Sequence, residues 1–366
     1  MGPFRGLDPP PPPPKDRLDR TIKLEDLIKI RILGIGLFGT VWLVRREGDG
    51  GGPYALKVMS KSGIVENQQV QAVVRERNIL SQIDHPFILK LVNTYQDESS
   101  LYLLTDLIQG GELFSVIHSP SADSSDENGR GARHGIPEES ARFYAACVLE
   151  SLCHLHKRCI CYRDLKPENV LIDAKGYCKL IDLGFAKVVT GKTFTFCGTP
   201  EYMAPEIVLS KGHDGGADYW ALGILIYEML VGRSPFVAAA QTQVGLFKNI
   251  VSMEWGFPPD CDGDDRATAI SEIAQDLVRS LIVYRQAHRL GCLAGGSQDV
   301  RDHSWFGPIN LRSNHLLREE IRPPWVPEIG DTLDSSHFDS YGDLEGEATP
   351  SPSLLSSHQK DLFQDF

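Results

Sequence analysis

The hydrophobic pattern of this chain changes at Gly110-Gly111, and this change constrains the fold more than any other feature. Between Lys23 and Leu107, short β-type runs such as TVWLV and YALKVM surround one stretch with apolar residues at helical spacing. After the two glycines, EESARFYAACVLESLCHLHK and ADYWALGILIYEMLVG indicate long helices. The sequence therefore predicts a bilobed α+β fold, with a small antiparallel β lobe that carries one main helix and a larger helical lobe.

Composition marks the remaining boundaries. Residues 1–22 include six consecutive prolines, Pro9 to Pro14, which predicts an extended and disordered leader. Residues 119–135 are polar and rich in serine and glycine, so we expect a disordered insertion between two helices. From residue 310 to 366 no periodicity is evident, which indicates a tail that lies on another surface. The small lobe would then span 23–108 and the helical lobe 109–309.

Charge and cysteine usage narrow the class of function. The net charge of -12 argues against nucleic-acid binding and suits cationic partners. No apolar run approaches the ~18 residues of a membrane span, and no signal peptide precedes the polar N-terminus. The eight cysteines lack the paired spacing of a zinc cluster. We therefore expect reduced thiols and a cytoplasmic location.

A glycine-rich stretch, LGIGLFGTV, places Gly34, Gly36 and Gly39 at the spacing G-x-G-x-x-G. Dinucleotide-binding loops share this spacing, but they open a helix. Here the following residues, TVWLV, are β-branched and aromatic, so the loop is predicted to join two strands. Glycines let its backbone approach phosphates without a Cβ in the way. A glycine hairpin with no ligand is the alternative.

Two charged residues are expected to meet in the small lobe. Lys57 stands among apolar residues in YALKVM, where an unpaired ammonium would be costly. The helical stretch offers Glu76 as its partner, although an ordinary surface lysine is the alternative. The junction between the two lobes should form a cleft, and such clefts bind small ligands.

The stretch CYRDLKPENV places Asp164, Lys166 and Asn169 within six residues. A polar surface turn is the alternative, but an apolar helix end and the strand VLID flank the stretch and favour a site. Asp182 directly follows another apolar strand. Its carboxylate and the Asn169 amide would supply oxygen ligands of the kind that Mg²⁺ prefers. The sequence thus predicts magnesium that bridges nucleotide phosphates.

Taken in order, these motifs resemble those of the eukaryotic protein kinases. The chain carries the glycine loop, Lys57, Glu76, YRDLKPEN, DLG, GTPEYMAPE, Asp218 and Arg289. YRDLKPEN, GTPEYMAPE and the terminal FQDF are similar to the AGC group. TFCGTPEY and HFDSY are similar to its cyclic-nucleotide-dependent kinases, of both the cGMP- and the cAMP-dependent type.

The resemblance implies a serine/threonine kinase that uses ATP and Mg²⁺. Asp164 would orient the substrate hydroxyl and accept its proton, while Lys166 would balance charge on the γ-phosphate. Asn169 and Asp182 would hold the metal, and Lys57, paired with Glu76, would bind the α and β phosphates. The gatekeeper position holds Thr105. The other implied ATP contacts are Leu33, Gly34, Gly36, Phe38, Gly39, Val41, Ala55, Asp106, Ile108 and Phe338.

The same resemblance implies partners and further site residues. Protein substrates with arginines before the target Ser or Thr are expected, because a guanidinium can make two hydrogen bonds to a carboxylate. Thr195 matches a phosphosite for an upstream activating kinase, with Arg163 and Lys187 as phosphate partners. The implied substrate contacts are Glu112, Glu168, Thr199, Glu201, Glu228, Phe196, Pro200 and Met203. The implied structural residues are Glu206, Asp218 and Arg289. The tail is implied to fold back over the small lobe, with Phe363 and Phe366 in an apolar pocket beside the Glu76 helix and Phe338 and Tyr341 near the nucleotide cleft.

Three positions depart from the family pattern and leave alternatives open. Leu183 replaces the usual Phe after the metal-binding Asp, Ala72 replaces a His, and Phe194 replaces a surface Trp where regulatory subunits dock. A pseudokinase scaffold would need the loss of Lys57, Asp164 or Asp182, and all three are present. A basophilic AGC kinase without cyclic-nucleotide control is another reading. Control by cyclic nucleotides would require a separate regulatory subunit, because no such binding domain is evident.

Overall fold

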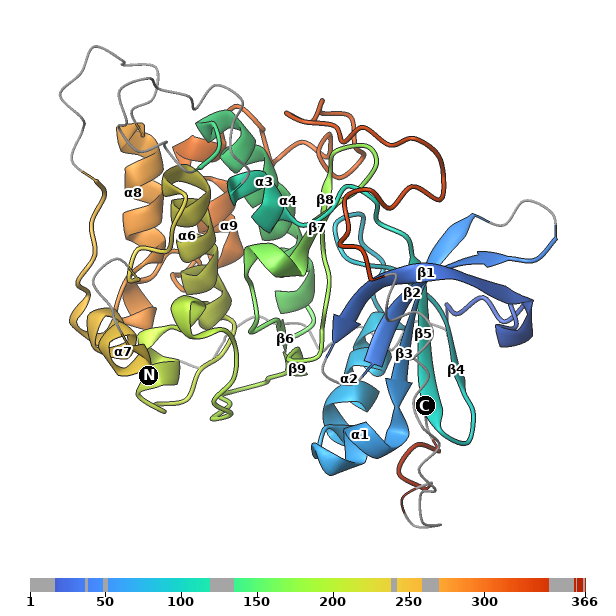
Figure 1. The fold of residues 1–366 in the computed structure, drawn as a ribbon. Coiled ribbons are helices and arrows are strands. Elements are labelled where there is room, and N and C mark those ends of the chain that lie inside the picture. Colours follow the sequence, from blue (N-terminus) through green and yellow to red (C-terminus); the bar gives the residue numbers. More distant parts are fainter. Residues whose placement is uncertain are drawn as a thin grey trace.

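The small lobe is built on a five-stranded antiparallel sheet with the order β1-β2-β3-β5-β4 (Figure 1). The computed structural model describes residues 17–36, 39–48, 52–118, 135–237, 242–258, 270–341, 359, 361–364 and 366. One sheet face buries a cluster that includes Ile32, Trp42 and Leu56. The strands are β1 (Leu27–Gly36), β2 (Gly39–Arg46), β3 (Pro53–Ser60), β4 (Leu91–Gln96) and β5 (Ser100–Asp106). The predicted glycine loop therefore does join two strands.

Two helices accompany this sheet, α1 (Lys61–Glu66) and α2 (Val70–Leu80). The α2 helix follows the predicted helical stretch and buries Val73, Glu76 and Leu80. The α1 helix was not predicted. It is short and begins where the Ser60 hydroxyl accepts a hydrogen bond from the amide of residue 63, at 3.3 Å.

The larger lobe is mainly helical, as predicted. Its centre is formed by α4 (Glu138–His156) and α6 (Gly216–Val231), both of which are buried along most of their length. Figure 1 shows α8 packed on the outer side of α6. The other helices of the described chain are α3 (Leu113–His118), α5 (Pro205–Val208), α7 (Gln243–Ser252), α8 (Glu272–Leu281) and α9 (Ser297–Arg301). The predicted bilobed α+β fold is confirmed.

Short strand pairs hold the segments that carry the polar motifs. The predicted hairpin of VLID with CKLI forms as β7 (Val170–Ile172) and β8 (Cys178–Leu180). A second pair, β6 (Ile160–Cys161) with β9 (Lys187–Val188), was not predicted. Each strand of this second pair has only two residues, so no sequence period could reveal it.

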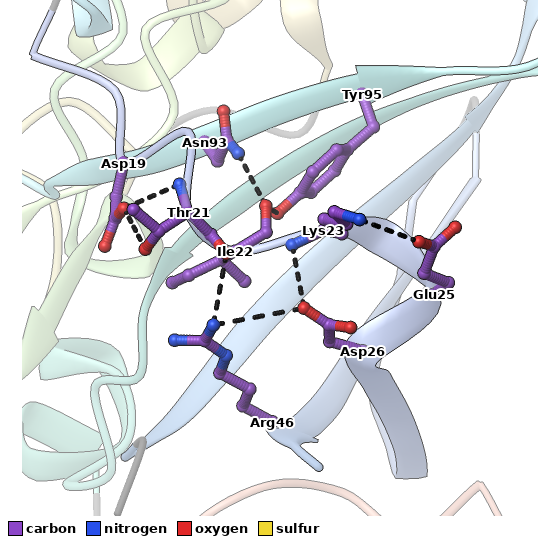
Figure 2. Close-up of polar contacts among 9 residues, drawn as sticks. All are labelled: Asp19, Thr21, Ile22, Lys23, Glu25, Asp26, Arg46, Asn93 and Tyr95. Atoms are coloured by element: carbon purple, nitrogen blue, oxygen red, sulfur yellow. Dashed lines mark hydrogen bonds and ion pairs between the residues drawn. The ribbon is translucent and has the colours of Figure 1, made fainter. Parts of the chain in front are cut away.

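The N-terminal segment corrects one predicted boundary. Residues 17–22 were assigned to a disordered leader, but Ile22 is buried and its carbonyl accepts hydrogen bonds from Asn93 Nδ2 (3.0 Å) and the Tyr95 hydroxyl (2.8 Å). Arg46 Nη2 donates to the carbonyl of Thr21 at 3.1 Å, so the segment is fastened to β2 and β4 (Figure 2). An isolated isoleucine in a polar stretch did not signal this packing. Residues 1–16 of the leader, and 119–134 of the predicted insertion, lie outside the described residues.

The tail crosses from the large lobe back to the small one. Gln109 Nε2 donates to the carbonyls of Asp331 (3.1 Å) and Asp334 (3.0 Å), and Arg31 Nη1 in β1 donates to Ser335 Oγ at 2.8 Å. This crossing explains the two glycines at the junction. A Cβ at residue 110 would lie 2.6 Å from a backbone oxygen of β7 and 2.8 Å from a tail proline, and residue 111 has φ +77.

Seven cysteines lie in the described part of the chain, and all are free. Five of them are buried, while Cys159 and Cys292 are half-buried. Burial raises the pKa of the Cys153 thiol to about 11 and that of Cys292 to about 12. No helix among the described residues is long and apolar enough to cross a membrane.

Candidate active site

The predicted ion pair forms between β3 and α2. Lys57 Nζ lies 3.0 Å from Glu76 Oε1 and 3.2 Å from Oε2. Burial lowers the pKa of Lys57, but the Glu76 and Asp182 carboxylates outweigh it and raise the pKa above its ordinary value. Burial, helped by Asp182, raises the pKa of Glu76 against the opposing effect of Lys57. A charged ammonium is thus held beside two carboxylates.

The Asp164 carboxylate is fixed from three directions. Its Oδ1 accepts hydrogen bonds from the backbone amide (3.1 Å) and hydroxyl (3.0 Å) of Thr199. Its Oδ2 accepts from Asn169 Nδ2 at 2.8 Å and lies 3.6 Å from Lys166 Nζ. The three motif residues therefore meet as the sequence predicted. Asp164 is buried, so its orientation is set before any substrate arrives.

The loop that carries Asp164 is held from below by Asp218 at the start of α6. Asp218 accepts hydrogen bonds from the backbone amides of Tyr162 (2.9 Å) and Arg163 (2.8 Å), and His156 Nε2 lies 2.7 Å from Oδ2. Arg163 adopts a left-handed backbone with φ +70. Such a conformation persists in a non-glycine residue only where its surroundings impose it. Asp218, which is almost fully buried, supplies that constraint.

A second strained residue, Asp182, lies next to the Lys57–Glu76 pair. Its φ is +52, and its Oδ1 accepts a hydrogen bond from the Gly184 amide at 3.0 Å. A Cβ on Gly184 would lie 3.0 Å from that oxygen and 4.0 Å from Glu76 Oε2. The missing side chain therefore keeps space open between these two carboxylates.

The donor set fits a magnesium ion. Asn169 uses its amide nitrogen for both hydrogen bonds to Asp164, which leaves the amide oxygen on the opposite edge. The backbone amide of Ile181 donates to the carbonyl of Asn169 at 3.0 Å, so Asn169 and Asp182 are close neighbours. An amide and a carboxylate oxygen are hard ligands of the kind that Mg²⁺ takes, with water and phosphate completing its shell. Within the described chain, no cluster of three His, Cys, Asp or Glu side chains is suited to a metal.

The glycines of the loop have two different roles: one allows close packing of strands, and the other two leave the backbone accessible. A Cβ on Gly39 would lie 1.8 Å from the carbonyl oxygen of Val58 in β3, so close strand packing requires this glycine. A Cβ on Gly34 would meet nothing within 4 Å, and one on Gly36 would have its nearest contact at 3.7 Å. Backbone at these two positions is open to a ligand. Phe38 lies outside the described residues.

The other predicted nucleotide contacts come from the sheet, the junction and the tail. The Thr105 hydroxyl donates to the carbonyl of Ala55 at 3.4 Å, which fixes the buried gatekeeper position. Burial raises the pKa of Asp106. Leu33 and Ile108 are buried, whereas Val41, Ala55, Asp106 and Phe338 are half-buried. Their role as an adenine pocket stays a prediction.

The predicted phosphosite is accessible, and a lysine lies close to it. Thr195 is exposed, and its hydroxyl lies 3.4 Å from that of Thr193, which accepts a hydrogen bond from Lys187 at 3.1 Å. Among the described residues, Arg163 Nη1 is buried without a hydrogen-bond partner. Arg75 of α2, which the sequence analysis missed, is also nearby. Burial and the positive charge of Arg163 lower the pKa of Arg75.

The four predicted substrate carboxylates lie in one acidic region. Burial, Glu168 and the tail residue Asp339 raise the pKa of Glu112. Burial, Glu228 and Glu168 raise the pKa of Glu201. The mutual effects of these carboxylates indicate that they lie near one another, although they come from the residue before α3, the catalytic loop, the turn Pro200–Tyr202 and α6. Glu228 differs from the rest, because it is buried and already bonded to His118 and Tyr202.

The predicted apolar contacts are unequal. Phe196 is exposed and its ring lies 6.1 Å from that of Phe247. Pro200 is half-buried. Met203 is buried in the large hydrophobic core and is not available to a substrate side chain in this structure. Phe194 is exposed at 68%, as expected for a surface position.

Two of the predicted structural residues, Arg289 and Glu206, form a buried ion pair in the large lobe. Arg289 donates to Glu206 through two bonds, Nη1 to Oε1 (2.7 Å) and Nη2 to Oε2 (3.0 Å). Arg289 also donates to the carbonyl of Gly216 at 2.7 Å and is fully buried. The satisfied donors offset the cost of burying this charge.

The tail folds back on the small lobe, as the resemblance implied. The approach of Phe338 and Tyr341 to a nucleotide stays a prediction. Phe363 is fully buried, and Lys61 Nζ stands 5.5 Å from the centre of its ring. Gln96 Nε2 donates to the carbonyl of Phe363 at 3.1 Å, and Phe366 packs beside it. Tyr341 packs against the cluster on the other face of the sheet.

Comparison with known proteins supports this picture. Residues 27–306 match the family described as Protein kinase domain. The cAMP-dependent protein kinase catalytic subunit of Dictyostelium discoideum is 40% identical over 358 residues, which cover 98% of this chain and 50% of that protein. The cGMP-dependent protein kinase, isozyme 2 forms cD5/T2, of Drosophila melanogaster is 39% identical over 348 residues, which cover 94% of this chain and 34% of that protein.

A third relative matches over most of its own length. The cAMP-dependent protein kinase, catalytic subunit-like, of Caenorhabditis elegans is 37% identical over 346 residues, which cover 94% of this chain and 79% of that protein. By contrast, the chain spans half of the Dictyostelium relative and about a third of the Drosophila one. The family match includes every motif from the glycine loop to Arg289. This chain belongs to the protein kinase domain family.

Proposed function

We propose that the chain is a serine/threonine protein kinase that transfers the γ-phosphate of ATP to proteins with arginine near the target hydroxyl. The observation that carries this proposal is the Asp164 carboxylate, held by Thr199, Asn169 and Lys166. Phosphoryl transfer needs alignment and charge neutralisation more than covalent help from the protein. A buried, oriented carboxylate opposite a charged lysine meets both needs.

Each residue has a role in this mechanism. Asp164 orients the substrate hydroxyl and accepts its proton, while Lys166 balances negative charge on the transferred group. Lys57, kept charged by Glu76, binds the α and β phosphates. Asn169 and Asp182 would hold Mg²⁺, which would supply positive charge to neutralise the phosphates.

Regulation and partners form part of the same proposal. Similarity to both cAMP- and cGMP-dependent kinases supports membership of the cyclic-nucleotide-dependent group, with a separate regulatory subunit as the partner that binds the cyclic nucleotide. An upstream kinase would phosphorylate Thr195. Free thiols in the described part of the chain support a cytoplasmic location. The units 23–108, with residues 17–22 packed on it, 109–309 and 310–366 are the proposed boundaries.

Replacing Asp164 by alanine tests the activity. Because a positioned base contributes roughly 10²–10⁴ to the rate, Asp164→Ala should lower kcat by that factor and leave ATP binding nearly intact. The assay is transfer of labelled phosphate to an arginine-containing serine peptide. Asp276→Ala, at an exposed carboxylate on α8, is the matched control and should retain activity. Near-normal turnover of Asp164→Ala, or no transfer by the wild type, would contradict the proposal.

A further inference from the structure

Glu228, one carboxylate of the acidic region, is already paired with a histidine of the chain itself. His118 ends α3, and its Nε2 lies 3.2 Å from Oε1 of Glu228 in α6. The Glu228 side chain is 9% exposed and that of His118 is 27% exposed. The family resemblance implied Glu228 as a contact for substrate arginine, whereas no sequence motif singles out His118.

The second oxygen of Glu228 is occupied as well. The Tyr202 hydroxyl donates to Oε2. Burial, with Glu228 next to it, raises the pKa of Tyr202, so the hydroxyl keeps its proton and stays a donor. Both oxygens of Glu228 are therefore engaged before a substrate arrives. A guanidinium that binds a carboxylate in the fork arrangement uses both oxygens.

The two partners differ in how readily they can leave. Tyr202 is buried beneath the carboxylate, whereas His118 is half-buried at a helix end. The His118 ring rests against Phe114, one turn earlier, with centroids 4.3 Å apart. Phe114 is itself exposed at 40%, so this contact does not enclose the imidazole. Rotation of His118 is the local change that would open Oε1.

We infer that His118 is a specificity-determining residue that competes with substrate arginine for Glu228. This inference rests on the proposed function. An arginine directed at Glu228 must displace the imidazole, whereas Glu112 and Glu168 are exposed. His118 therefore lowers the contribution of one arginine position in the substrate and leaves the others unchanged.

The test uses a series of serine peptides in which one arginine is moved through successive positions before the target. KM and kcat are measured for the wild type, His118→Ala, Glu228→Gln and the double variant. His118→Ala should lower KM by roughly three- to tenfold for one arginine position, with kcat unchanged. This gain should vanish in the Glu228→Gln background. His118→Gln, which keeps a donor, should restore most of the wild-type KM.

A matched control comes from another histidine–carboxylate pair. His315 Nδ1 lies 2.5 Å from Glu320 Oε2 on an exposed surface, so His315→Ala should leave every KM unchanged. The inference is overturned if His118→Ala changes no KM, changes all of them equally, or gives the same gain with Glu228→Gln. A wild type that does not favour arginine peptides over a neutral one would overturn the proposed specificity together with this inference. If the His118 predictions fail while the wild type still favours arginine peptides, the proposed arginine specificity holds and only this inference is wrong.

Discussion

At the scale of single residues, the acidic region shows how neighbouring charges set protonation. Glu112 and Glu201 are partly desolvated and face other carboxylates, and the pKa of each is raised. As the pH falls, these two groups bind protons earlier than an ordinary glutamate would. An arginine side chain keeps its charge throughout this range. The attraction between the peptide and the site should therefore weaken before ordinary surface glutamates titrate.

This difference predicts a pH dependence of peptide recognition. As the pH falls from neutral toward the ordinary glutamate range, KM for an arginine peptide should rise, by up to roughly tenfold for each lost charge partner. KM for a neutral peptide should change less. In Glu201→Gln the dependence should be shallower, since one titrating group is gone. Identical pH profiles for the two peptides would count against the acidic region as the arginine site.

Residue-level prediction from sequence succeeded where a motif fixes both the residue type and its spacing. The meeting of Asp164, Lys166 and Asn169 follows from one short loop, and the pairing of Lys57 with Glu76 follows from the cost of an unpaired buried ammonium. Arg75 and His118 were missed because each acquires its role from a distant segment. No local pattern marks such a residue.

At the scale of elements, the segment that carries Thr195, here called the activation segment, is predicted to be ordered by cations from both lobes. Arg163 has a buried Nη1 without a hydrogen-bond partner in the described chain. Lys187 donates to the Thr193 hydroxyl, which lies next to that of Thr195. Arg75 of α2 lies close enough to Arg163 for the two charges to repel. A phosphate on Thr195 would add up to about two negative charges and three acceptor oxygens. It would therefore order the segment and connect it to α2, which carries Glu76.

We predict that Thr195→Ala lowers kcat/KM by about tenfold or more, because the cation cluster then lacks its counter-charge. Arg75→Ala should lower the activity of the phosphorylated chain and leave that of Thr195→Ala unaffected. Peptide assays on chains with and without phosphate at Thr195, verified by mass spectrometry, give both numbers. Thr190→Ala, at another exposed threonine of the same segment, is the control for loss of a hydroxyl. Full activity of Thr195→Ala would refute the switch.

Elements with a clear period were predictable, and those defined by tertiary contact were not. The α4 and α6 helices and the β7–β8 hairpin are evident from apolar spacing. The β6–β9 pair exists only because the catalytic loop and the activation segment run side by side. Likewise, residues 17–22 are ordered by hydrogen bonds to β2 and β4 and not by any propensity of their own.

At the scale of the whole molecule, the tail connects the two lobes at several points. It contacts the junction through Gln109, β1 through Arg31 and the region beside α1 through Phe363. The missing periodicity indicated only that this segment lies on a surface, whereas the family resemblance implied docking on the small lobe. The placement depends on a pocket assembled from separate parts of the small lobe.

Phe363 provides the test of tail docking. Phe363→Ala should reduce stability by up to about 3–5 kcal/mol, the usual cost of removing a buried phenylalanine, and should lower activity through the loss of support for the small lobe. Leu362→Ala is the matched control, because the neighbouring leucine is 43% exposed. Differential scanning calorimetry and the peptide assay measure both effects. Equal melting temperatures for Phe363→Ala and the wild type would argue against docking.

The burial of the native thiols also decides how this chain can be labelled. Maleimides react with accessible thiolates, and among the described cysteines only Cys159 and Cys292 are not buried. Burial raises the pKa of Cys292 to about 12, which leaves it almost entirely protonated at neutral pH. Cysteines introduced at two exposed positions, Glu98 in the small lobe and Ala294 in the large one, would react faster than these. A donor and an acceptor dye at these two positions would report the opening and closing of the cleft by energy transfer.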